Sequence, residues 1–239
     1  MHERSNVQTA LLSILGSARQ PLGAGAAREA LCREGFEVSE ATAGRLLRAL
    51  EEQGLARKVS VQGRLLTDQG RLLLETTQRE QRRSQSAEAF LEVLEATQRR
   101  EMIDLLVARR AIEGEIASLA ARYGTEEELR QLRELLTLTQ VARAEGRNLA
   151  ALDQRFHGLI AAMSRNRVLE AALQLIRQHG DPSPILPEIR ARSGHGSGQD
   201  HVLILEALEA RDPERAREAM TNHLGSVLAD VEAYPEKPL

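Results

Sequence analysis

Two residue types that can hold a metal, an aspartate and a histidine, stand four positions apart at Asp153 and His157. On an α-helix this spacing places both side chains on one face, one turn apart. The neighbouring apolar residues Leu149, Phe156 and Ile160 fall on the same side. We therefore expect the carboxylate and the imidazole to point into the protein, where a charge is costly unless it is paired or bound to a cation.

Two further histidines, His201 and His223, interrupt the apolar faces of other helical segments. One aspartate and three histidines suit a divalent transition metal, zinc or nickel in preference to manganese, and four protein ligands leave octahedral positions open for water or an effector. The alternative is a set of ordinary core histidines, and the spacing alone leaves both interpretations open. The apolar residues that share these faces are Ile204, Leu205 and Leu208 for His201, and Ala216, Met220, Val227 and Val231 for His223.

These four residues need helices to position them, and the chain has a dense helical pattern from about Glu101 onward. Thr125 and Glu128 have the spacing of a capping box, and Asp212 precedes a proline at the first position of the last helix. Residues 180–199 contain three Pro and four Gly, which predicts a loop and a candidate lid. No strand pattern occurs here, so we expect an all-α bundle. The predicted helices cover residues 101–122, 125–146, 149–164, 168–179, 201–210 and 213–234.

The composition fits a helical protein of the cytoplasm. Of 239 residues, 42% are hydrophobic and 2% aromatic, with no Trp, so Leu, Ala and Ile must fill the core. Cys32 is the single cysteine, which excludes an intramolecular disulfide and suits a reducing compartment. No apolar run reaches the ~18 residues of a membrane span, and no signal-peptide pattern is present. We therefore expect a cytoplasmic protein without a membrane partner.

The first 75 residues have the pattern of a winged helix-turn-helix. Helical stripes are predicted over residues 6–16 and 24–33, and Ser39 has the position of an N-cap for a third helix. Two short extended runs flank Gln62-Gly63, as in a hairpin with a glycine turn. Three helices followed by a basic hairpin predict this DNA-binding fold.

Charge and side-chain type favour DNA as the partner of this segment. Residues 1–83 carry 13 Lys and Arg against 10 Asp and Glu, whereas residues 84–239 carry 19 against 25. A basic head permits contact with nucleic acid; the alternative is a three-helix domain with an ordinary solvated basic face. The predicted DNA-binding set comprises Ser39, Thr42, Arg45 and Arg48 on the third helix, for base edges, and Arg57, Lys58 and Arg64 on the hairpin, for phosphates.

Between head and body, residues 71–100 are rich in Gln, Arg, Glu, Ser and Thr and contain no Gly or Pro. This composition predicts a polar helix, either a stiff connector that transmits a shift or a plain surface helix. The predicted domains are a winged helix-turn-helix domain at 1–75, a helical connector at 76–99 and a metal- and effector-binding bundle at 100–234, followed by a tail at 235–239.

Four motifs occur in order in the head: Pro21-Leu22-Gly23, Gly35-Phe36-Glu37-Val38-Ser39-Glu40, Leu50-Glu51-Glu52-Gln53-Gly54-Leu55 and Gly63-Arg64-Leu65-Leu66-Thr67-Asp68-Gln69-Gly70. Together they resemble the winged helix of archaeal nitrogen-regulation repressors. The usual head of GntR-type regulators begins with Pro-Gly-x-x-Leu, which this chain lacks. The dimer geometry and operator spacing of GntR-type regulators therefore do not transfer.

A second series of motifs runs through the body: Arg109-Arg110-Ala111-Ile112-Glu113, Ala117-Ser118-Leu119-Ala120-Ala121, Asp153-Gln154-Arg155-Phe156-His157, Ser164-Arg165-Asn166, His201-Val202-Leu203-Ile204-Leu205-Glu206-Ala207-Leu208 and Ala216-Arg217-Glu218-Ala219-Met220-Thr221-Asn222-His223-Leu224. They resemble the FCD domain, the effector-sensing domain of FadR-subfamily GntR regulators. That resemblance implies an antiparallel helical bundle with a central cavity. The Pro/Gly-rich stretch differs from the helix that the family has there.

The resemblance also implies roles for individual residues. In the metal-binding branch of the family, the aspartate and the three histidines singled out above match the four ligands. Arg109 matches the arginine that faces the cavity and pairs with an effector carboxylate, a task suited to a guanidinium fork. Asn166 matches a helix-breaking position of the motif, and we include it in the predicted effector site.

Two classes of function follow from these patterns. The first is a dimeric transcriptional regulator that binds an operator in double-stranded DNA, in which the metal and Arg109 capture a small carboxylate and change the spacing of the two heads. The second is a metal-dependent enzyme, against which we expect no spare acid or base beside the ligands. A metal with only a structural role is a further alternative.

Overall fold

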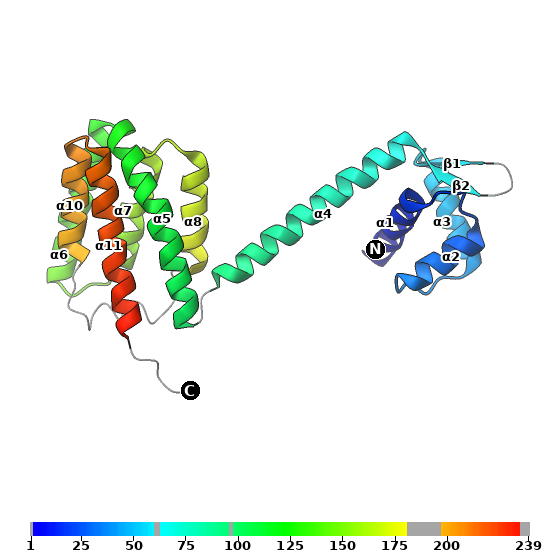
Figure 1. Cartoon of the computed structure of the whole chain (residues 1–239), viewed down its shortest axis with the longest axis horizontal. Helices are drawn as coiled ribbons and strands as arrows, with labels where there is room; N and C mark the ends of the chain where they lie inside the picture. The colour runs from blue at the N-terminus through cyan, green and yellow to red at the C-terminus, as the bar shows by residue number, and fades with distance from the viewer. Residues whose placement is uncertain (1, 60–62, 96–97, 181–196, 235–239) are drawn as a thin grey trace. The chain divides into compact units, whose positions relative to one another are not determined.

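The computed structural model describes residues 2–59, 63–95, 98–180 and 197–234. The chain divides into two compact units, Met1–Glu88 and Ala89–Leu239 (Figure 1). Each unit has its own apolar core, and the two are described separately. In the described part of the chain no helix is both long enough and apolar enough to cross a membrane.

The N-terminal unit consists of three helices and a small two-stranded sheet. The elements are α1 (His2–Ser17), α2 (Ala24–Arg33), α3 (Glu40–Glu52), β1 (Ala56–Lys58) and β2 (Arg64–Leu66). The strands are antiparallel, with Ala56 opposite Leu66 and Lys58 opposite Arg64. This arrangement confirms the predicted winged-helix fold. The predicted turn partner Gln62 lies outside the described residues.

Local sequence explains why these elements begin and turn where they do. The Ser39 hydroxyl accepts a hydrogen bond from the Thr42 amide at 3.2 Å and so caps α3, as predicted. Gly63 has a φ of +132°, and a Cβ at this position would collide with the backbone of Leu22. Glycine is therefore required where β2 begins, both for its backbone conformation and for the close approach of the neighbouring segment.

The polar segment after the sheet forms one long helix, α4 (Asp68–Leu94), which begins in the N-terminal unit and ends in the C-terminal unit. The predicted helix over residues 71–100 was wrong in its C-terminal boundary, because a new helix starts at Arg99. The side chain of Glu101 accepts a hydrogen bond from the Gln98 amide at 2.9 Å, in a capping box that begins this next helix.

The C-terminal unit is a bundle of helices, as predicted. Figure 1 shows α5 and α11 side by side and running in opposite directions, and these two helices share the most extensive packing. The helices are α5 (Arg99–Tyr123), α6 (Glu126–Ala144), α7 (Ala150–Met163), α8 (Arg167–Gly180), α10 (Ser197–Glu209) and α11 (Pro213–Ala233). The Thr125 capping box and the Asp212 cap are both present.

The predicted loop at 180–199 was too long at both ends. Helix α8 includes Gly180, and α10 begins at Ser197, before the predicted start at His201. Helix propagation into polar and glycine residues follows from the packing of each helix on the bundle, which outweighs weak local propensity. Residues 181–196, with the candidate lid, lie outside the described residues.

The inward stripes of the body helices are largely confirmed. Phe156 and Ile160 of α7 are at most 1% exposed and pack with buried residues of α5, α6, α10 and α11, whereas Leu149, at the start of the helix, is only half-buried. The apolar neighbours expected around His201 and His223 are buried as well: Ile204, Leu205 and Leu208 on α10, and Ala216, Met220, Val227 and Val231 on α11.

Candidate metal centre

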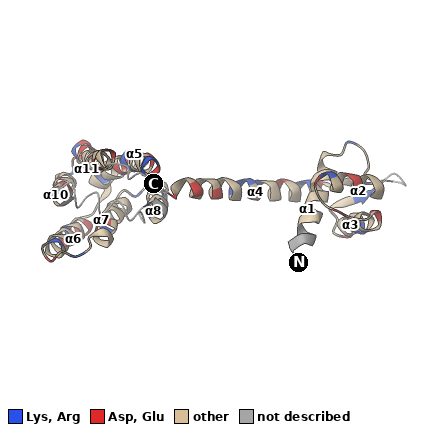
Figure 2. Ribbon diagram, turned by 90° about the horizontal axis from the view of Figure 1, so that it is seen from below, with Lys and Arg blue, Asp and Glu red and all other residues tan. Residues whose placement is uncertain are grey.

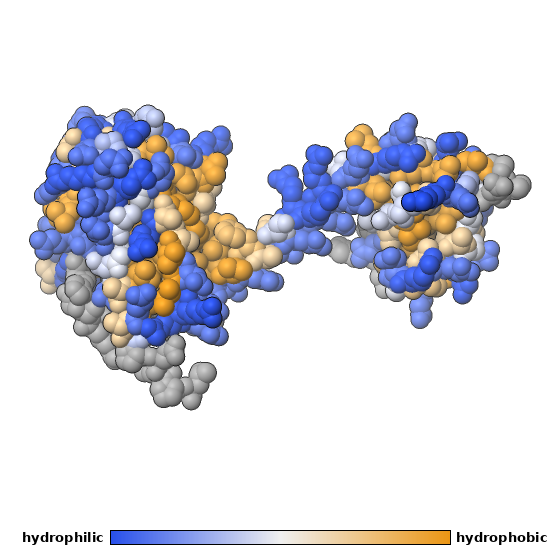
Figure 3. Space-filling view, in the orientation of Figure 1, coloured by the Kyte–Doolittle hydropathy of each residue, from blue (hydrophilic) through white to orange (hydrophobic). Residues whose placement is uncertain are grey.

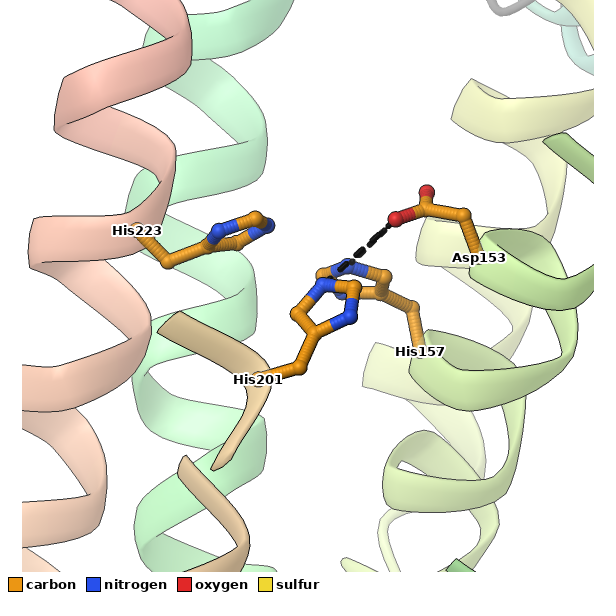
Figure 4. A group of neighbouring side chains, drawn as sticks. All are labelled: Asp153, His157, His201 and His223. Carbon is orange, nitrogen blue, oxygen red and sulfur yellow. Dashed lines mark ion pairs between the residues drawn. The ribbon is translucent and has the colours of Figure 1, made fainter. Parts of the chain in front are cut away.

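Three helices bring the aspartate and the three histidines together in the C-terminal unit. Helix α7 carries Asp153 and His157, α10 carries His201 and α11 carries His223, and the four side chains converge in Figure 4. One potential ligand atom from each residue lies within 4.8 Å of all the others. Oδ1 of Asp153 is 3.5 Å from Nε2 of His201 and 3.7 Å from Nε2 of His157.

The imidazoles are part of the core, whereas the carboxylate is at its edge. His157 is 1% exposed, and His201 and His223 are 2% exposed. The side chain of Asp153 is 29% exposed, so it is less deeply placed than its helical face indicated. The ring of His201 stacks on Phe156, with a centroid separation of 4.3 Å and an interplanar angle of 20°. Packing therefore restrains the rings before any ligand is bound.

Two carboxylates, outside the four-residue set, contact the Nδ1 atoms of His157 and His223 and orient these two rings. Oε2 of Glu113 accepts a hydrogen bond from Nδ1 of His157, and Oδ2 of Asp200 lies 3.2 Å from Nδ1 of His223. A carboxylate only accepts, so each Nδ1 carries a proton, and Nε2 is the atom that a neutral ring would offer to a metal. Carboxylate–histidine pairs of this kind fix the tautomer and ring orientation of metal ligands.

The surroundings of Nε2 of His157 also fit a bound metal. Its Nε2 is fully buried and makes no hydrogen bond to any of the residues that the structure describes. A buried polar atom without a partner is costly. A cation among the four side chains would satisfy this atom, and three nitrogens with one oxygen form a donor set suited to a divalent transition metal.

Two arginines complete the cluster. Nε of Arg109 on α5 donates to Oε1 of Glu113 at 2.8 Å, and both side chains are buried. Nη2 of Arg177 on α8 donates to Oδ2 of Asp153 at 2.8 Å, and Arg177 is 5% exposed. Each guanidinium thus has a carboxylate partner, which is the condition for burying an ionised group.

These neighbours keep the carboxylates ionised. Burial raises the pKa of Asp153, but the charges of His157, Arg177 and His201 lower it more, and the pKa lies well below its usual range. Burial likewise raises the pKa of Glu113, while His157 and Arg109 lower it to a value far below that of an ordinary glutamic acid. Both groups therefore carry a negative charge at neutral pH.

Three residues of this cluster were missed from the sequence. We expected no spare acid or base beside the ligands; the structure places Glu113 there, in contact with His157 and engaged by Arg109. A signal for Glu113 was available, since it stands four positions after Arg109 on one helix. Asp200 directly precedes His201, and Arg177 follows the buried Ile176, but neither position by itself indicates a contact across the bundle.

Asn166, predicted in the effector site, has a local structural contact. Its side-chain oxygen accepts hydrogen bonds from the amides of Val168 and Leu169, both at 3.2 Å, at the beginning of α8. The side chain therefore caps a helix, in agreement with the helix-breaking position that it matches. A role in effector binding stays a prediction.

The predicted DNA-binding residues all lie in the N-terminal unit (Figure 2, Lys and Arg in blue). On α3, Arg45 and Arg48 are exposed, and Arg45 donates to the Thr42 hydroxyl at 3.1 Å. On the strands, Arg57 and Lys58 are exposed, whereas Arg64 is paired with Glu51 at 2.8 Å. Arg64 is thus held within the unit, and its contact with a phosphate stays a prediction, as do the other DNA contacts.

Comparison with known families gives two matches along the chain. The model of the FCD domain matches residues 104–226, and the model of the ribonuclease R winged-helix domain matches residues 9–74. The first match covers the whole of the candidate metal centre. The second agrees with the winged-helix fold of the head, whose resemblance to archaeal nitrogen-regulation repressors stays a prediction.

Individual relatives match about half of the chain. The Uxu operon regulator of Haemophilus influenzae is 28% identical over 140 residues, which are 54% of this chain and 53% of that protein. The HTH-type transcriptional repressor NanR of Cronobacter sakazakii is 28% identical over 52% of this chain and 49% of its own length. The chain thus spans about half the length of these curated relatives.

Among solved structures, E. coli McbR/YncC matches with a TM-score of 0.50 and 17% sequence identity, over 95% of this chain and 94% of that chain. At this level of identity the likeness concerns the fold, and it agrees with a winged helix followed by a helical bundle.

Proposed function

Because the chain belongs to the FCD-domain family, we propose that it is a ligand-responsive transcriptional regulator, in which the N-terminal unit binds operator DNA and the C-terminal unit binds an effector. The matched relatives support this proposal, since they carry the names of an operon regulator and a transcriptional repressor. The exposed basic residues Arg45 and Arg48 on α3 and Arg57 and Lys58 on β1 are the proposed DNA contacts, with base edges for α3 and phosphates for the hairpin.

The observation that carries the proposal is the convergence of four donor atoms within 4.8 Å in the core of the bundle. We propose that Asp153, His157, His201 and His223 hold a divalent transition metal, with zinc or nickel preferred to manganese. Such an ion, when bound, supplies a Lewis-acid anchor for an oxygen of the effector. The chain itself supplies the orientation of the rings through Glu113 and Asp200.

The proposed effector is a small carboxylate that binds beside Arg109. Nε of Arg109 is engaged by Glu113, and this bond fixes the direction of the planar guanidinium. A fixed fork is suited to a carboxylate because two N–H donors can meet two oxygens. The effector would thus be recognised by charge at both ends of the site, by the arginine and by the metal.

A homodimer would couple the effector to DNA binding. The C-terminal unit exposes several large apolar side chains, among them Phe90 at 47%, Val93 at 72% and Val107 at 45%, and Figure 3 shows hydrophobic patches on the face of this unit that is turned to the viewer. Such patches are suited to contact with a second copy. Effector binding shifts operator affinity only if the effector prefers one of two arrangements of the dimer.

An enzymatic function has less support. Glu113 stands beside the ligands, but it is 1% exposed and is engaged by both His157 and Arg109, so it is not placed to exchange protons with a substrate. The names of the relatives are those of regulators. A metal with a purely structural role is distinguished from a sensing role by the experiment that follows.

The test has two readouts on the full-length protein. Elemental analysis of the wild type should give about one transition metal per chain, lost in Asp153→Ala and retained in Asp104→Ala, a matched change at an exposed aspartate. DNA duplexes enriched from a random library by the protein then serve as operators in fluorescence anisotropy. Carboxylates that shift wild-type DNA affinity should have no effect in His157→Ala or His223→Ala.

Three outcomes separate the possibilities. A metal-free wild type, after purification without chelators, contradicts the metal centre. An effector response that survives both histidine substitutions contradicts metal-mediated sensing, even if a metal is bound. The absence of any duplex enriched above non-specific binding contradicts the regulatory function itself.

A further inference from the structure

A fifth side chain, Arg177, holds the aspartate of the candidate metal centre. Arg177 lies on α8, which supplies none of the four proposed ligands, and it is 5% exposed. Its Nη2 donates a hydrogen bond to Oδ2 of Asp153 at 2.8 Å. Burial of a guanidinium is costly without compensation by an acceptor. The Arg177–Asp153 contact therefore compensates a buried charge, unlike the ion pairs between solvent-exposed side chains at the surface.

The two oxygens of Asp153 consequently face different partners. Oδ2 is engaged by Arg177, whereas Oδ1 lies 3.5 Å from Nε2 of His201 and 3.7 Å from Nε2 of His157. The view in Figure 4 shows the carboxylate with one oxygen turned toward the imidazoles. A divalent ion among the imidazoles would therefore meet one carboxylate oxygen and not both.

Asp153 is also the member of the cluster that packing restrains least. Its side chain is 29% exposed, against 1–2% for the three histidines. All three histidine rings are buried in the core, and His157 and His223 also have carboxylate partners of their own, whereas the aspartate has no comparable enclosure. A hydrogen-bond partner from outside the ligand set is the usual means of orienting a ligating carboxylate.

We propose that Arg177 is a positioning residue of the metal centre, which restricts Asp153 to coordination through a single oxygen and so keeps one coordination position open for the effector. This inference rests on the proposed function, because it requires a metal at the four-residue site. It assigns α8 a part in the centre although that helix contributes no ligand.

The test uses Co²⁺ as the probe, because its visible absorption reports coordination number and geometry. In the full-length protein, Arg177→Lys keeps the positive charge but loses the planar fork. We expect the Co²⁺ affinity to fall about tenfold and the absorption bands to lose intensity, since a freed carboxylate binds through both oxygens and raises the coordination number. The matched control is Arg165→Lys, because Arg165 makes a two-bond pair with Glu128, at 2.9 and 2.7 Å, and is exposed.

A double-mutant comparison separates positioning from general structural support. If Arg177 acts through Asp153, then Arg177→Lys in an Asp153→Ala background should change the affinity of the remaining weak site by less than about twofold. An equal loss in both backgrounds overturns the proposal, as does an Arg177→Lys protein with wild-type affinity and spectrum. Should Arg177→Lys not reach wild-type helicity by circular dichroism, Arg177→Met takes its place in the same comparison.

Co²⁺ binding by the wild type distinguishes the absence of a metal centre from an error in the role of Arg177. If the wild type binds no Co²⁺ at all, the metal centre itself is absent, and the positioning role falls with it. If the wild type and Arg165→Lys bind Co²⁺ equally while Arg177→Lys behaves like the wild type, the metal centre stands and only the role of Arg177 is wrong.

Discussion

The cores of the two units differ in the side chains that they bury. In the N-terminal unit the core is made of apolar side chains, such as Leu11, Leu31 and Leu47. Every buried polar or charged side chain among the described residues belongs to the C-terminal unit, from Arg109 to Asp230. Among the described residues the head thus keeps its charged side chains outside its core, whereas the body buries several of them inside.

The cost of each arrangement is also different. An apolar core depends on packing, and its loss is graded with the volume removed. A buried cluster of charges depends on complete pairing, because removal of one partner leaves the others uncompensated. The contrast predicts which substitutions affect which unit, and the following experiments test it in order of expected effect.

The largest effect is expected from Glu113→Ala in the body. Glu113 is 1% exposed and contacts both Arg109 and His157, so its removal leaves a buried cation and a ring without their acceptor. We expect the free energy of unfolding to fall by about 3–5 kcal/mol, measured by urea denaturation. Glu115→Ala is the control, because Glu115 pairs with Arg217 at the surface and should cost under about 1 kcal/mol. Equal effects would remove the contrast between buried and exposed charge.

The next effect concerns the apolar head. Leu47 on α3 is fully buried, and Leu47→Ala should destabilise the N-terminal unit by about 3 kcal/mol. Leu46→Ala, one position earlier and only partly buried, should cost less. Hydrogen exchange read by mass spectrometry should show the increase within residues 2–59 and 63–88. A comparable increase around the metal centre would mean that the two cores are not independent.

A divalent metal should act on the body alone. Zn²⁺ at a free concentration of one hundred times its dissociation constant should stabilise the unit that binds it by about 2.7 kcal/mol. The expected result is a rise of the thermal transition of the C-terminal unit, reversed by a chelator, with protection of the head unchanged. A shift that persists in His223→Ala would place the bound metal elsewhere.

The smallest effect belongs to an exposed helix end. Burial raises the pKa of Glu128, but the hydrogen bonds from the Thr125 backbone amide and from Arg165 together lower it by more. The pKa of Glu128 therefore lies below its ordinary value of 4.5. The stabilisation is therefore present above pH 4.5 and is lost as the pH falls below it. We expect Glu128→Gln to cost up to about 1 kcal/mol at pH 7 and less at pH 3, measured by urea denaturation. A cost that is independent of pH would show that the charge has no part in the cap.

Short-range patterns predicted much of this protein. The Ser39 and Thr125 caps, the glycine at the turn and the helical stripes of the body are properties of neighbouring residues, and they were found as expected apart from the half-buried Leu149. The four proposed metal ligands were singled out for the same reason, since each interrupts an apolar stripe on its own helix. Helix ends were less accurate: α10 begins earlier than predicted, and the connector helix α4 ends at Leu94, before the Gln98 capping box that begins α5.

The sequence by itself determined which side chains point inward, because that depends on a helical period of 3.6 residues. Only the tertiary structure decided which inward side chains meet. Glu113 faces His157 across 44 positions of the chain, and Arg177 faces Asp153 across 24. Those pairings depend on how α5, α7 and α8 pack, and no local pattern specifies that. The partners of the four proposed ligands are therefore a property of the fold, whereas the proposed ligands themselves could be singled out in the sequence.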